Sequence, residues 1–280
     1  MAALRRDIGE MSLIDGQTVR VEERWADGEP DRLPTLAREL VALDPAVIIA
    51  VARASIEAVR AVSMTVPIVG NDLENDPLLA GYAASFARPG GNVTGLFLDA
   101  PAICAKWLQQ ITELVPNLRR LAVVWDPGTG PYQRDAFLAA AKAAAIEATG
   151  IEFRGGSRVE AVVERGLKPD VQALVLLGSP LIRRAGGTIA AVAARHRLPG
   201  ISPFRTFPDG GGLMSYGVDL VEMYRRLVPF VAKVLNGTRP GDIPLEQPSK
   251  FELVVNLKAA KALGLAVPAS LLTMADEVIE

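Results

Sequence analysis

Residues 85–95, S-F-A-R-P-G-G-N-V-T-G, raise the question of how the chain is divided. Their glycines permit a phosphate-binding loop, a glycosylation acceptor or a joint between two bodies. A phosphate-binding loop places its glycines between a strand and a helix, whereas Gly95 leads into the apolar run G-L-F-L. Asn92-Val93-Thr94 matches the N-glycosylation pattern, but glycosylation of this pattern is relevant only in a secreted eukaryotic chain. The stretch therefore favours a joint, with a hinge at Gly90, Gly91 and Gly95.

Size and composition indicate a globular protein. The 280 residues are 50% hydrophobic and 22% charged, and they suffice for one large α/β domain or two lobes. Thirty basic and thirty-two acidic side chains give a net charge of -2 without a dense basic stripe. Because phosphate neutralisation supplies most nucleic-acid affinity, we expect no nucleic-acid partner. The apolar window around Asp44 and Pro45 is too short to cross a bilayer, so no transmembrane segment is expected.

The chain has one cysteine and one histidine. Cys104 alone excludes an intrachain disulfide and a cysteine-based zinc site, and its helical context predicts a buried, inert thiol. His196 comes at the basic end of a predicted helix and is interpreted as a helix-terminus cation. We therefore expect no catalytic triad, no metal site and no cofactor.

Short apolar runs alternate with helix-length amphipathic segments, a pattern typical of parallel sheets covered by helices on both faces. The fold class predicted is α/β, with two Rossmann-like lobes. The strands predicted for the first lobe are 18–25, 46–51, 66–70 and 92–97, and those that follow are 121–125, 151–155, 173–177, 199–202, 212–216 and 251–255.

A second glycine cluster at 208–217 precedes a long helical segment and predicts that the chain crosses back there. Ser215 in this cluster is a further hinge candidate. A third crossing is expected near the P-G-D-I-P-L-E-Q-P stretch. The predicted boundaries are 1–96 with 214–240 for lobe 1 and 97–213 with 241–280 for lobe 2, with a ligand cleft between the lobes.

Several stretches closely resemble the ABC-transporter substrate-binding protein family that includes tryptophan-binding-like lipoproteins. They include R-W-A-D-G (24–28), A-R-P-G-G-N-V-T-G-L (87–96), G-G-L-M-S-Y-G (211–217) and, most specifically, the whole of 247–280, from Q-P-S-K-F-E-L-V-V-N to A-D-E-V-I-E. The resemblance implies a type I periplasmic-binding fold with three crossovers. It also implies an extracytoplasmic receptor that passes a small solute, such as an amino acid, to an ABC permease.

The chain departs from the family pattern at two places. It begins M-A-A-L-R-R-D-I-G-E without the apolar region of an export signal, already inside the family's first helix. We therefore expect the first strand of lobe 1 to be missing, and the compartment to be periplasmic by resemblance but cytoplasmic if the sequence is complete. In the loops, V-A-R-A-S and G-N-D-L-E-N-D-P replace the Gly-Thr and Gly-Asp-Pro stretches of the family. The resemblance therefore predicts the fold better than it predicts the identity of the ligand.

In open α/β sheets, ligands bind beyond the carboxyl ends of the strands. Ser55 opens a helix there, either as a ligand contact or as an ordinary N-cap. Trp125 is either a ligand contact or part of the core, and Tyr216 is either a ligand contact or hinge packing. The predicted ligand-binding residues are Ser55, Asn71, Asp72, Trp125, Asp126, Tyr132, Ser179 and Tyr216.

These polar groups do not pair a nucleophile with a base, so they indicate binding and not catalysis. The leading hypothesis is the substrate-binding component of an ABC importer that closes its lobes on an amino acid or aromatic compound. The alternatives are a non-exported ligand sensor of the same fold and a doubly wound α/β enzyme. We expect a monomer.

Overall fold

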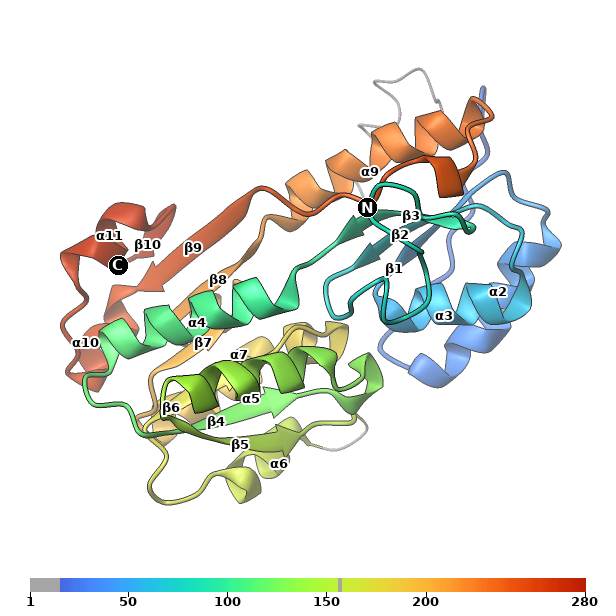
Figure 1. Cartoon of the computed structure of the whole chain (residues 1–280). Coiled ribbons are helices and arrows are strands. Elements are labelled where there is room, and N and C mark those ends of the chain that lie inside the picture. The colour runs from blue at the N-terminus through green and yellow to red at the C-terminus, as the bar shows by residue number, and fades with distance from the viewer. Residues whose placement is uncertain (1–15, 156–157) are drawn as a thin grey trace. The chain divides into compact units, whose positions relative to one another are not determined.

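The computed structural model describes residues 16–155 and 158–280. The chain forms two compact units (Figure 1). Unit 1 extends to Leu98 and includes Asp219–Lys250, and unit 2 contains Asp99–Val218 and Phe251–Glu280. The chain therefore passes between the units three times, as the sequence predicts.

The crossings lie at positions different from the predicted ones. Residues 214–218 were assigned to lobe 1, but they form a strand in the sheet of unit 2. Residues 241–250 were assigned to lobe 2, but they bond to unit 1: Gly90 N–H donates to Gly241 O at 3.0 Å, and Glu246 N–H donates to Gly95 O at 2.9 Å. Backbone pairing between distant segments sets these boundaries, and the glycine clusters do not.

Unit 1 is built on a parallel sheet of order β1-β2-β3. The helices α2 and α3 share one hydrophobic cluster with this sheet, including Ile56, Ile68 and Phe97. Val228 of α9 packs against Ile49 of β1, whose side chain points to the opposite face. The elements are η1 (Pro30–Arg32), α2 (Leu33–Ala42), β1 (Ile48–Val51), α3 (Arg53–Val62), β2 (Ile68–Asp72), β3 (Val93–Phe97), α9 (Leu220–Leu235) and η3 (Pro240–Asp242).

The strand predicted at 18–25 is wrong, because this stretch contains no ladder strand in the structure. Its charged side chains instead pair locally, with Arg24 contacting Glu22 at 3.5 Å and Glu39 at 2.9 Å. Trp25 remains 51% exposed. Alternating polarity was present, but within the described residues the stretch forms only a single β-bridge, at Val19. The predicted absence of a first strand concerns the start of the chain, which lies outside the described residues.

Unit 2 has a seven-stranded sheet of order β10-β9-β8-β7-β6-β4-β5, in which β8 and β9 are antiparallel and the other pairs parallel. The strand predicted at 151–155 begins earlier, and the last strand was not predicted. The strands are β4 (Arg120–Trp125), β5 (Glu147–Glu152), β6 (Ala173–Leu176), β7 (Gly200–Ser202), β8 (Met214–Val218), β9 (Phe251–Asn256) and β10 (Glu277–Ile279).

Helices and short helical turns connect these strands, and α7 and β6 share a large hydrophobic cluster that includes Leu174, Ile189 and Phe207. They are α4 (Ala100–Leu114), η2 (Pro127–Thr129), α5 (Tyr132–Ala143), α6 (Val159–Gly166), α7 (Pro180–Arg195), α8 (Thr206–Asp209), α10 (Leu257–Leu263) and α11 (Ala269–Met274).

Aspartates begin the helices next to two crossings. Asp99 accepts a hydrogen bond from Ala102 N–H at 3.1 Å at the start of α4. Asp219 caps α9, and its ion pair with Lys250, at 2.8 Å, lowers the pKa of the Asp219 carboxyl. Such caps satisfy backbone donors that the helix leaves unpaired.

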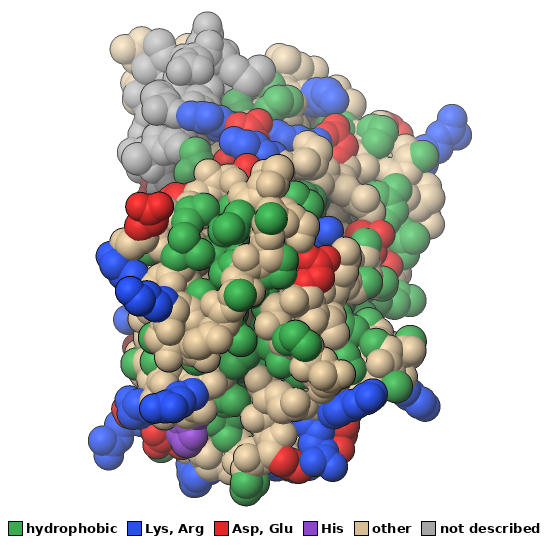
Figure 2. Space-filling model, turned by 90° about the vertical axis from the view of Figure 1, so that its left-hand side faces the viewer, with side chains coloured by type: hydrophobic (Ala, Val, Ile, Leu, Met, Phe, Trp, Pro, Cys, Tyr) green, Lys and Arg blue, Asp and Glu red, His purple; other side chains and the backbone are tan. Residues whose placement is uncertain are grey.

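Both positive and negative side chains are present on the face shown in Figure 2. Arg195 forms ion pairs with Glu160 and Glu164. His196 is the C-cap residue of α7, so it lies at a helix end as predicted. No helix within the described ranges, 16–155 and 158–280, is both long and apolar enough to span a membrane.

Candidate functional site

Polar side chains are buried at the carboxyl end of β2, in the centre of the unit 1 sheet. Asn71 and Asp72 end the strand and are 1% and 0% exposed, and Glu74 and Asn75, in the loop that follows, are also buried. Burial of polar groups is costly unless they are hydrogen-bonded. The partners of these groups therefore determine what the cluster can bind.

Asp72 uses only half of its carboxylate within the protein. Its Oδ1 accepts hydrogen bonds from Glu74 N–H at 2.9 Å and Asn75 N–H at 3.1 Å. Its Oδ2 is buried without a hydrogen-bond partner, and so is Oδ1 of Asn71. Both unpaired atoms are acceptors, so the end of β2 is suited to a ligand that donates hydrogen bonds.

The two acceptors lie on opposite faces of the sheet, because side chains alternate along a strand. A Cβ placed on Gly70 would lie 2.9 Å from Ile56 of α3, so Gly70 and Asp72 share the α3 face. Asn71 therefore faces the side on which α9 packs.

Burial raises the pKa of Asp72 to about 6, and its contacts with Glu74 and with backbone N–H groups only partly offset this effect. Tyr82 lies near enough for Asp72 to contribute to a raised pKa of the Tyr82 hydroxyl, after the larger effect of burial. A donor with positive charge placed beside Asp72 would reverse the shift of its pKa.

Ser55 lies in the first turn of α3, but it is not the N-cap. The N-cap is Ala52, at φ 67°, and Ser55 N–H donates to Ala52 O at 3.2 Å. Arg53 N–H donates to Glu74 Oε2 at 3.3 Å and so ties the start of α3 to the loop after β2. The N-cap alternative for Ser55 is therefore wrong, while a ligand contact stays a prediction.

In unit 2, three predicted residues follow neighbouring strands. Trp125 ends β4, Asp126 follows it, and Ser179 follows β6, which pairs with β4. Asp126 Oδ1 accepts from Gly128 N–H at 2.8 Å, and Ser179 Oγ accepts from Ile182 N–H at 3.0 Å as the N-cap of α7. Burial raises the pKa of Asp126, and hydrogen bonds from Gly128 and Ser179 oppose this effect.

The aromatic residues of unit 2 have partners of different kinds. Trp125 is 7% exposed, and the Arg134 guanidinium lies 4.4 Å from its ring centroid. Tyr132 is half-buried and begins α5. Tyr216 stacks on Phe251 at 5.5 Å between ring centroids, within the β8–β9 ladder. The stacking supports the interpretation of Tyr216 as packing.

Gln133 is a buried residue that sequence reasoning missed. Its Oε1 accepts from Gly178 N–H, and its backbone oxygen accepts from Cys104 Sγ at 3.6 Å. Gln133 thus joins the start of α5 to the loop that carries Ser179. A glutamine inside a helical pattern carries no signal of such a contact. The Cys104 thiol is buried, as predicted, and burial raises its pKa to about 12.

The predicted hinge residues lie inside the units. Gly90, Gly91 and Gly95 precede the crossing at Leu98–Asp99, and Ser215 lies within β8, ahead of the crossing at Val218–Asp219. Gly90 bonds to Gly241, and Gly95 lies in β3, where its φ is 131°. A close approach to Gly70 accounts for the glycine at 95, and a positive φ of 75° accounts for the one at 90, while a hinge role for these residues stays a prediction.

The family model for ABC transporter substrate binding proteins matches residues 5–279. The chain belongs to this family. The tyrosine-binding protein of Clostridioides difficile (strain R20291) is 23% identical to this chain over 257 residues. The match covers 90% of this chain and 72% of the relative.

Solved structures share the fold of this family member. A conserved domain protein from Vibrio cholerae matches with a TM-score of 0.92 and 22% identity, over 99% of this chain and 93% of that one. An ABC domain from Streptococcus pneumonia in complex with L-Trp matches with a TM-score of 0.91 and 21% identity, over 99% and 93%. The chain thus has the type I periplasmic-binding fold, an α/β fold of two lobes.

Proposed function

We propose that the protein is the substrate-binding component of an ABC importer and captures an amino acid, with aromatic amino acids as the first candidates. The observation that carries this proposal is the buried, unpartnered carboxylate oxygen Asp72 Oδ2 at the carboxyl end of β2. An α-ammonium group supplies donors and positive charge for such an acceptor. The tyrosine and L-Trp named for two similar proteins support this choice.

Asp72 is a better candidate for the ammonium than Asp126. The Asp126 carboxylate accepts hydrogen bonds from Gly128 N–H and from the Ser179 side chain, whereas Asp72 keeps one buried oxygen without a partner. We assign to unit 2 the side chain of the ligand, with Trp125 and Tyr132 as aromatic surfaces. In this proposal the two units close on the ligand, a permease receives it, and the protein does not convert it chemically.

Calorimetry with L-tryptophan and L-tyrosine tests the proposal. Asp72→Asn keeps an oxygen for the N–H groups of Glu74 and Asn75 but removes the charge. Loss of one partner of a buried ion pair costs about 3–5 kcal/mol, so affinity should fall at least about 100-fold.

The matched control is Asp76→Asn. Asp76 lies in the same loop, and its Oδ1 accepts from Leu78 N–H at 2.7 Å and Leu79 N–H at 3.0 Å, contacts that asparagine also makes. This variant should bind like the parent. Equal losses in both variants would remove Asp72 from the site, and chemical conversion of either amino acid would contradict a purely binding role.

A further inference from the structure

A pocket of about 790 Å³ opens on unit 1 at the amino ends of its strands. Ala46, Pro67 and Asn92 line it, and they precede β1, β2 and β3 respectively. Because Asn71 and Asp72 end β2, the pocket lies at the opposite edge of the sheet from these acceptors. It is therefore separate from the site proposed for the amino acid.

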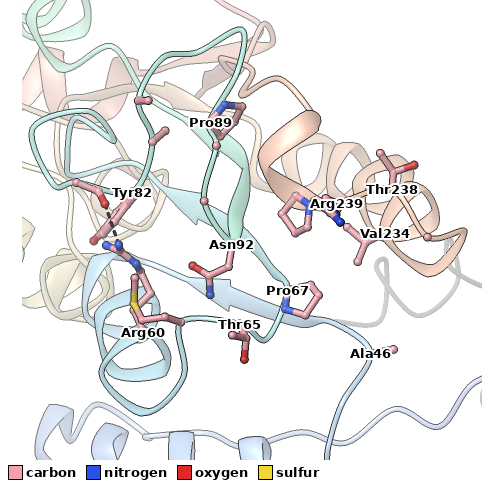
Figure 3. Close-up of a pocket in the computed structure, with 18 residues that line it drawn as sticks. Ala46, Arg60, Thr65, Pro67, Tyr82, Pro89, Asn92, Val234, Thr238 and Arg239 are labelled. Carbon is pink, nitrogen blue, oxygen red and sulfur yellow. Dashed lines mark hydrogen bonds between the residues drawn. The ribbon is translucent and has the colours of Figure 1, made fainter.

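Two charged side chains are among the described residues that line the pocket, and both are arginines, Arg60 and Arg239. In Figure 3 they lie on opposite sides of the pocket, with Arg60 on α3 and Arg239 just beyond α9. Within the described part of the chain, Arg239 has no ion-pair partner, and its side chain is exposed. The pocket therefore presents positive charge without a carboxylate to balance it.

The Arg60 guanidinium is held in place but not fully bonded. Its Nη2 donates to Gly81 O at 2.8 Å, the dashed line in Figure 3, and the guanidinium carbon lies 5.1 Å from the ring centroid of Tyr82. Its Nε is buried without a hydrogen-bond partner. An unpaired buried donor costs free energy, and an acceptor bound beside it would remove that cost.

The rest of the wall is largely apolar. Met64, which is 60% exposed, contributes a thioether side chain, and three prolines also line the pocket. The apolar lining residues are Ala46, Met64, Pro67, Ala83, Ala84, Pro89, Val234 and Pro240. A ligand that matches this lining has an apolar body as well as an anionic group.

We propose that this pocket is a second binding site, for a small organic anion with a carboxylate head and an apolar body. The planar guanidinium groups of Arg60 and Arg239 suit a carboxylate, since they present N–H donors in a fork. The apolar body lies against Met64 and the prolines, where its transfer from water is favourable.

The test is an NMR titration of the arginine Nε–Hε signals with benzoate, with benzyl alcohol as the neutral analogue. Benzoate should shift the Arg60 and Arg239 signals saturably, and benzyl alcohol should leave them in place. Arg239→Gln should weaken benzoate binding about tenfold, because a hydrogen bond between charged groups is lost. The matched control is Arg38→Gln on α2, where the exposed guanidinium contacts Thr35 Oγ1 at 3.2 Å outside the pocket, and it should bind benzoate like the parent.

Inorganic phosphate tests the need for an apolar body and should bind at least about tenfold more weakly than benzoate, because it buries no apolar surface. Arg60→Gln also loses the contacts with Gly81 and Tyr82, so Arg239→Gln is the deciding variant. L-tryptophan affinity, measured in the same variants, should stay unchanged, which separates this site from the proposed amino-acid site. Absence of saturable shifts with benzoate, or equal affinities of Arg239→Gln and Arg38→Gln, would overturn the proposal.

Discussion

Asp72 is the residue whose ionisation should be most visible in the stability of the protein. Its folded-state pKa of about 6 lies above the ordinary 3.8, because the charged form is buried. Between pH 3.8 and about pH 6, Asp72 therefore binds a proton more readily in the native state than in the unfolded state. Ionised Asp72 destabilises the fold above pH 6, and this cost disappears as the pH falls towards 4.

We expect the parent to gain up to about 3 kcal/mol relative to Asp72→Asn when the pH is lowered from 7 to 4. Asparagine has no proton to gain, so it removes this contribution while other titrating groups cancel in the comparison. Urea unfolding of both proteins at several pH values measures the difference. A difference that does not change with pH would show that Asp72 has an ordinary pKa.

The sheet of unit 1 depends on a close approach of two strands at Gly95. A Cβ at Gly95 would lie 2.0 Å from Gly70 O on the neighbouring strand, and the φ of 131° is unfavourable for other residues. Gly95→Ala should therefore force β2 and β3 apart and destabilise the protein by more than about 3 kcal/mol, within the range of severe core changes.

Gly90→Ala is the control for this prediction. Gly90 also has a positive φ, 75°, but no atom lies within 4 Å of a Cβ placed there. The free energy of unfolding of this variant should fall only by the cost of backbone strain, about 1–2 kcal/mol. Thermal unfolding of both variants measures the contrast, and similar melting temperatures would mean that β2 and β3 separate at little cost.

At the scale of the whole molecule, the proposed function predicts that a ligand changes the arrangement of the two units, each of which has its own hydrophobic cluster. If both units contact the ligand, as proposed, saturating L-tryptophan should reduce the radius of gyration in small-angle scattering and raise the Tm. Asp72→Asn at pH 7 should show neither change at the same concentration. A raised Tm without compaction would place the ligand on one unit alone.

Much of the fold could be predicted from local sequence. Several of the strands appear as short apolar runs, among them A-V-I-I-A-V and A-L-V-L-L, because buried parallel strands need apolar residues on both faces. The family could also be recognised from 247–280, and the model match to residues 5–279 confirms it. The strand predicted at 18–25 failed because alternation indicates what a strand needs on its faces, but not how far pairing with a neighbour extends, which here is a single bridge at Val19.

The sequence by itself determined the α/β class, the family and the placement of Asn71, Asp72, Asp126 and Ser179 at or just beyond strand ends. Only the tertiary structure decided which of these polar atoms already have partners. Gly128 and Ile182 satisfy Asp126 and Ser179, whereas Asp72 Oδ2 and Asn71 Oδ1 stay buried and unpaired. The unit boundaries were also decided there, by hydrogen bonds such as Thr94 Oγ1 to Ile243 O at 2.9 Å. Hydrogen bonds and burial depend on which distant segments are in contact, and local sequence patterns do not predict those contacts.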